Sequence, residues 1–78
     1  MTLADLRKGG SARIESIHTD DSSIQRLMTM GLVEGASLTF VGASLGGDPL
    51  EFLLHGSAVS LRRADAQNFQ IQPDSGNG

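Results

Sequence analysis

The segment Gly42-Ala43-Ser44-Leu45-Gly46 matches the G-x-S-x-G pattern that surrounds the nucleophilic serine of many hydrolases. In those enzymes the serine lies on a strained turn between a strand and a helix, and an acid and a histidine elsewhere in the chain activate it. Here Gly47, Asp48 and Pro49 follow, and they cannot begin a long helix in register. We therefore interpret the segment as a glycine-rich loop and expect no enzymatic activity.

The two histidines, His18 and His55, are the strongest candidates for metal ligands, because the chain contains no cysteine. His18 is close in sequence to Asp20 and Asp21. His55 is close to Glu51. A structural metal site usually needs four convergent ligands, and neither group supplies them. We predict no metal site within one molecule, while a site between subunits stays open.

Length and composition place the function on the outer surface. A chain of 78 residues is expected to form one domain with a core too small to enclose a ligand cavity of about 300 Å³ or more. Secreted domains of this size usually carry disulfides, so the lack of cysteine favours the cytoplasm. The sequence has neither a secretory signal nor a long apolar run, and we expect no direct membrane insertion.

The charge pattern argues against a nucleic acid partner. The formal net charge is −3, the basic residues are scattered, and the only aromatic residues are three phenylalanines. Proteins that bind nucleic acids concentrate positive charge, and those that bind single strands add aromatic side chains. A small nucleic-acid-binding barrel that uses Arg62-Arg63 and Arg7-Lys8 is the alternative.

Alternating apolar and polar residues predict five short strands separated by turn residues. In the first strand Ile17 falls out of the alternation, which indicates a bulge or a twist. The pair Gly56-Ser57 predicts the tight turn of a hairpin. Because closing a small sheet removes its exposed edges, we predict a mainly β fold, a small five-stranded barrel. The expected strands cover residues 11–18, 36–43, 50–55, 58–61 and 68–72.

One α-helix is expected after the first strand, over residues 19–30. Ser22 and Gln25 fit a capping box at its start, and Gly31 stands where a left-handed C-cap is favoured. Residues 62–67 predict a single further helical turn. The apolar face of the main helix consists of Ile24, Leu27 and Met28.

Three segments carry a resemblance to a known family. The first is Arg26-Leu27-Met28-Thr29-Met30-Gly31-Leu32-Val33-Glu34-Gly35-Ala36, the second is Leu45-Gly46-Gly47-Asp48-Pro49-Leu50, and the third is Val59-Ser60-Leu61-Arg62-Arg63-Ala64-Asp65-Ala66. In this order and spacing they resemble the FeoA family, small accessory proteins of bacterial ferrous iron uptake. The likeness covers residues 3–72. Glu34 departs from it, because family members often have proline there.

The resemblance implies an SH3-like domain over residues 1–73, and we expect residues 74–78 to form a disordered polar tail. It also implies a partner, the FeoB-type ferrous iron permease with its cytosolic GTP-binding domain. The protein would then be cytoplasmic and peripheral to the inner membrane through that partner. It implies no cofactor. Weak homo-oligomerisation stays an open alternative.

A second interpretation is the SH3-like module of an iron-dependent transcription regulator. The C-terminal domain of regulators of the diphtheria-toxin-repressor type resembles the same barrel. We favour the accessory protein, because the sequence shows no pair of DNA-reading helices ahead of the barrel.

The expected docking surface combines the end of the helix with adjoining loops. Leu32 follows the C-cap glycine, and Leu45 stands alone in a polar loop. Each is an apolar anchor for a partner if it is exposed, and a core residue if it packs inward. The residues assigned to docking are Arg26, Met30, Leu32, Leu45, Asp48 and Pro49, and those assigned to structural turns are Gly31, Gly35 and Gly47.

Overall fold

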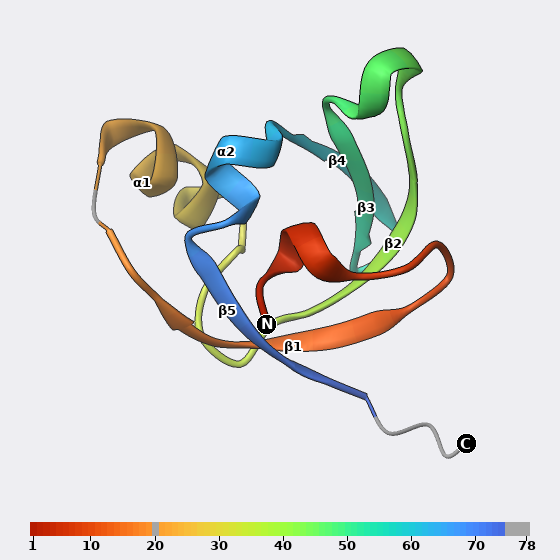
Figure 1. Ribbon diagram of the computed structural model, residues 1–78. Coiled ribbons are helices and arrows are strands. Elements are labelled where there is room, and N and C mark those ends of the chain that lie inside the picture. The colour runs from red at the N-terminus through yellow and green to blue at the C-terminus, as the bar shows by residue number, and fades with distance from the viewer. Residues whose placement is uncertain (20, 75–78) are drawn as a thin grey trace.

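The computed structural model describes residues 1–19 and 21–74. Its five strands are β1 (Ser11–Ile17), β2 (Ser37–Ala43), β3 (Leu50–Leu54), β4 (Ser57–Leu61) and β5 (Phe69–Pro73). The helical elements are the 3₁₀ turns η1 (Leu3–Asp5) and η2 (Leu45–Gly47) and the α-helices α1 (Ser22–Thr29) and α2 (Arg63–Ala66). The prediction of a mainly β fold with five strands and a helix after the first strand is confirmed (Figure 1).

All five strands form one antiparallel sheet in the order β4-β3-β2-β1-β5. The sheet curls into a barrel-like shape, with η1 and α2 in contact inside its curve (Figure 1). Of the bulge or twist expected in β1, the structure shows a bulge, because the register with β5 shifts between Ile14 and Ser16. The outer edge of β5 is partly covered by the N-terminus, where the Ile71 amide donates to the carbonyl oxygen of Met1 at 3.0 Å.

The core is apolar and draws on the sheet, both α-helices and η1. The alternation in β3 holds, since Leu50, Phe52 and Leu54 are buried. Phe40 is half-buried and packs against Phe52 with ring centroids 5.3 Å apart. The buried residues are Leu3, Ala12, Ile14, Ile24, Leu27, Leu32, Ala36, Leu38, Leu50, Phe52, Leu54, Val59, Leu61, Ala66, Phe69 and Ile71.

Two local predictions were wrong by about one residue. The N-cap of α1 is Asp21 and makes no side-chain hydrogen bond, so Ser22 and Gln25 lie one position too late for a capping box. The β3–β4 turn consists of His55 and Gly56, with φ angles of 53° and 82°. A tight hairpin turn of this kind needs positive φ at both positions, and Gly56 therefore takes the second position instead of the first.

The C-terminal end of the described chain bears on the predicted extent of the domain. The Asp74 amide donates to the carbonyl oxygen of Ser11 at 2.9 Å, so this residue is tied to β1. The rest of the predicted tail, residues 75–78, lies outside the described residues, as does Asp20 at the predicted helix start. None of the helices in the described part of the chain has the length and apolar character needed to cross a membrane.

Candidate functional site

The loop between β2 and β3, residues 44–49, presents Leu45 to solvent with its side chain 100% exposed. Two backbone hydrogen bonds close the loop: the Gly47 amide donates to the carbonyl oxygen of Ser44 at 2.9 Å, and the Ser44 amide donates to that of Pro49 at 3.0 Å. Gly46 and Gly47 both have positive φ, 85° and 84°, a conformation that glycine adopts at little cost. The β2–β3 loop is therefore a compact turn with an apolar side chain at its tip.

Arg63, the first residue of α2, fastens the β2–β3 loop to the rest of the protein. Its Nε and Nη2 atoms donate to the carbonyl oxygen of Gly47 at 3.3 and 3.0 Å, and Nη1 donates to that of Ala4 at 3.5 Å. Its backbone amide donates to Asp48 Oδ1 at 2.8 Å. The N-cap residue of α2, Arg62, makes no side-chain hydrogen bond to the helix. Asp48, which was assigned to docking, therefore accepts the hydrogen bond of a free backbone amide at the start of α2.

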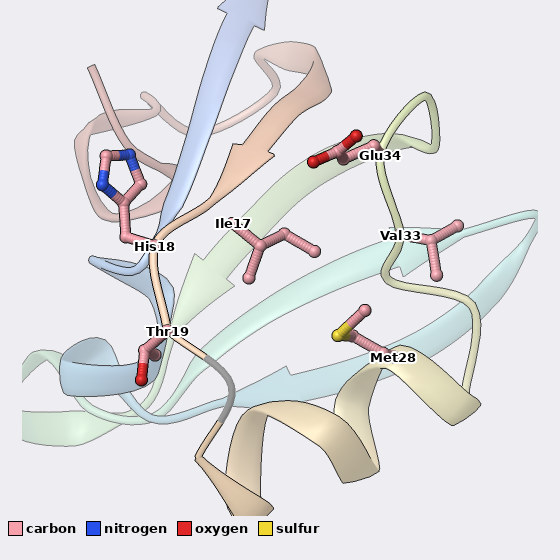
Figure 2. A pocket seen from close by; sticks show the side chains of 6 residues that line it. All are labelled: Ile17, His18, Thr19, Met28, Val33 and Glu34. Carbon is pink, nitrogen blue, oxygen red and sulfur yellow. The ribbon is translucent and has the colours of Figure 1, made fainter.

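An open apolar groove lies beside α1 (Figure 2). The side chains of Ile17, at the end of β1, and Met28, on α1, point toward one another, and Val33 of the segment after α1 also lines the groove. His18, Thr19 and Glu34 complete the lining of this α1 groove, whose volume is about 650 Å³. The sequence analysis assigned Met28 to the apolar face of the helix and so missed this groove, because the side chain is only half-buried at the margin of the core.

The end of α1 separates two residues that the sequence analysis assigned together to docking. Met30 is 53% exposed, whereas Leu32 is 0% exposed. Gly31, with φ of 111°, reverses the chain, and the Leu32 amide donates to the carbonyl oxygen of Leu27 at 3.2 Å. This turn directs Leu32 into the core, which corrects its assignment to the docking surface.

The remaining assigned residues do not form one continuous surface. Arg26 is exposed and lines a shallow hollow with Ser22 and Ser23 on α1. The β2–β3 loop, green in Figure 1, lies on the opposite side of the molecule from α1. The residues that were expected to form one docking surface therefore lie in two separate regions, the β2–β3 loop and the margin of α1. The three turn glycines, Gly31, Gly35 and Gly47, have positive φ.

The chemistry considered from the sequence has no support in the described residues. Ser44 is followed by the three-residue turn η2, which differs from the strand–turn–α-helix geometry of a nucleophile elbow. Within residues 1–19 and 21–74, no group of three or more histidine, cysteine, aspartate or glutamate side chains lies together as a set of metal ligands.

Comparison with known proteins gives a consistent family match. The FeoA domain model matches residues 1–73. A curated relative, the Fe(2+) transport protein A/Fe(2+) transporter FeoB fusion protein of Porphyromonas gingivalis, is 31% identical over 77 residues. The match covers 99% of this chain but only 9% of that protein. The similarity therefore concerns one small part of a much longer polypeptide.

Solved structures agree with that match. The FeoA protein of Chlorobium tepidum is 32% identical, with a TM-score of 0.86 over 94% of this chain and 70% of that chain. The zinc-complexed FeoA of Stenotrophomonas maltophilia, described as a procaryotic SH3 domain protein, is 29% identical, with a TM-score of 0.79 over 92% of this chain and 89% of that chain. A manganese-dependent transcriptional repressor, 17% identical with a TM-score of 0.82 over 94% of this chain and 36% of that chain, shares the fold alone.

Proposed function

This chain belongs to the FeoA domain family, and we propose that it acts as a cytosolic, non-enzymatic accessory protein that docks on a FeoB-type ferrous iron transporter. The fusion protein of Porphyromonas gingivalis supports this partner, because it joins a related segment to FeoB in one polypeptide. A covalent link keeps two modules at high effective concentration, an arrangement that suits modules acting in contact. In this proposal the protein is peripheral to the membrane through its partner.

The observation that carries the docking proposal is the complete exposure of Leu45 on a hydrogen-bonded loop. Burying a leucine side chain in an apolar pocket gains about 1.5–3 kcal/mol relative to leaving it in water. Because the β2–β3 loop is already shaped, little of this gain is lost to ordering the loop on binding. We infer that the transporter's cytosolic domain offers an apolar pocket wide enough for one leucine side chain.

A titration of the labelled protein with the cytosolic GTP-binding domain of a FeoB-type transporter tests the proposal. We expect the largest amide chemical-shift changes at residues 45–47. Leu45→Ala should weaken binding about fivefold or more, since truncating an interface anchor costs more than about 1 kcal/mol. Leu53→Ala is the matched control, because Leu53 is 39% exposed on β3 and outside the loop.

Three results would contradict the docking proposal. One is the absence of binding at tens of micromolar when both proteins are folded. A second is equal weakening by Leu45→Ala and Leu53→Ala, which would place the contact elsewhere or make it unspecific. Shift changes confined to Ile17, Met28 and Val33 would move the contact to the α1 groove and remove the role of the loop.

A further inference from the structure

We propose that Arg63 is the positioning residue that holds the β2–β3 loop in the conformation that presents Leu45. This inference rests on the proposed docking function. Two nitrogen atoms of the Arg63 guanidinium, Nε and Nη2, donate to the same carbonyl oxygen of Gly47, at 3.3 and 3.0 Å. The planar fork of an arginine suits such a paired contact, which a lysine ammonium cannot reproduce in the same geometry.

The β2–β3 loop has two internal backbone hydrogen bonds, but its side chains add little restraint of their own. The Leu45 side chain is 100% exposed, so no burial holds it in place. Gly46 and Gly47 follow, and glycine loses more conformational freedom on ordering than any other residue. A Cβ atom at Gly47 would lie 3.7 Å from Arg63 Nη2, an ordinary contact distance. The glycine is therefore required by its positive φ, and its carbonyl oxygen supplies the point of attachment.

The other contacts of Arg63 connect the loop to parts of the molecule that are fixed in the core. Nη1 donates to the carbonyl oxygen of Ala4 at 3.5 Å, and the neighbouring residue Leu3 is 1% exposed. The backbone amide of Arg63 lies at the start of α2, whose Ala66 is 0% exposed. Arg63 thus connects the glycine-rich β2–β3 loop to η1 and α2, two elements that have residues buried in the core.

The first test concerns the free protein and needs no partner. We expect Arg63→Ala to lower the backbone order parameters of the residue 45–47 amides from about 0.85 towards 0.6 or below, as in flexible loops. Arg63→Lys should give an intermediate loss, because it keeps the charge without the fork. Arg62→Ala is the matched control, since Arg62 is also exposed and precedes α2. Far-UV circular dichroism checks that each variant is folded, and Arg63→Lys serves if Arg63→Ala does not fold.

The second test is binding to the cytosolic domain of a FeoB-type transporter. Arg63→Ala should weaken binding about three- to tenfold, because a mobile loop must be ordered in the complex. Combined with Leu45→Ala, it should add little further loss, since the two residues act through one contact.

Unchanged order parameters at residues 45–47 in both Arg63 variants would overturn the inference. Suppose instead that the order parameters fall but neither Arg63→Ala nor Leu45→Ala affects binding. That result would support the positioning role of Arg63 and refute the docking proposal. The two ideas therefore fail separately.

Discussion

Replacing Leu32 by alanine should cost the protein about 3 kcal/mol of unfolding free energy, although the residue was assigned from the sequence to a docking surface. The side chain is 0% exposed, and truncation to alanine removes three carbon groups. Each is worth about 0.8 kcal/mol on burial, and the cavity that remains adds to the loss. A domain of 78 residues has a total stability of about 4–12 kcal/mol, so the variant loses at least a quarter of it.

Urea denaturation followed by far-UV circular dichroism measures this loss, because the chain has no tryptophan or tyrosine for fluorescence. With a slope of about 1 kcal/mol per molar urea, the midpoint of Leu32→Ala should fall by about 3 M at an unchanged slope. Leu45→Ala is the matched control and should move the midpoint by less than about 0.5 M, since its side chain is fully exposed. A loss below about 1 kcal/mol for Leu32→Ala, or an equal loss for the control, would refute the assignment of the two leucines.

Substitutions at three further positions test local features by thermal or urea unfolding. Gly31→Ala should destabilise by about 1–3 kcal/mol, because φ is 111° and a Cβ atom would lie 3.2 Å from Leu54 Cδ2; wild-type stability would contradict this strain. Asp48→Ala should cost about 1 kcal/mol by removing the acceptor of the Arg63 amide, and Asp48→Asn should recover most of it. His55→Asn should raise the melting temperature by about 2–4 °C, because asparagine tolerates the φ of 53° better; an unchanged or lower value would count against this reason.

Much of the fold could be predicted from the sequence because its signals are local. The alternation of Leu50, Phe52 and Leu54 identifies β3 and its buried face. In β1 the alternation of apolar and polar residues breaks at Ile17, and this break indicates the irregularity that the structure shows as a bulge. Element ends were less certain, as the shifted turn at His55 shows, because the choice between neighbouring turn positions depends on the register of both strands.

The candidate site was harder to predict, because the same residue type has opposite roles in it. Leu32 and Leu45 each stand next to a glycine in a turn-rich segment, and the sequence left both assignments open. The structure buries the first and exposes the second. The α1 groove was missed because a helical methionine next to core residues is expected to be buried, and only the arrangement of three separate segments leaves it partly open.

The sequence by itself determined the number and type of the main elements and the positions of the turn glycines, since these follow from periodicity and from the backbone freedom of single residues. Only the tertiary structure decided how the Leu45 loop is held, because Arg63 is 16 residues from Gly47 and 59 from Ala4 along the chain. No local pattern encodes a contact over such separations. The contact arises when the curled sheet brings η1, the β2–β3 loop and α2 together.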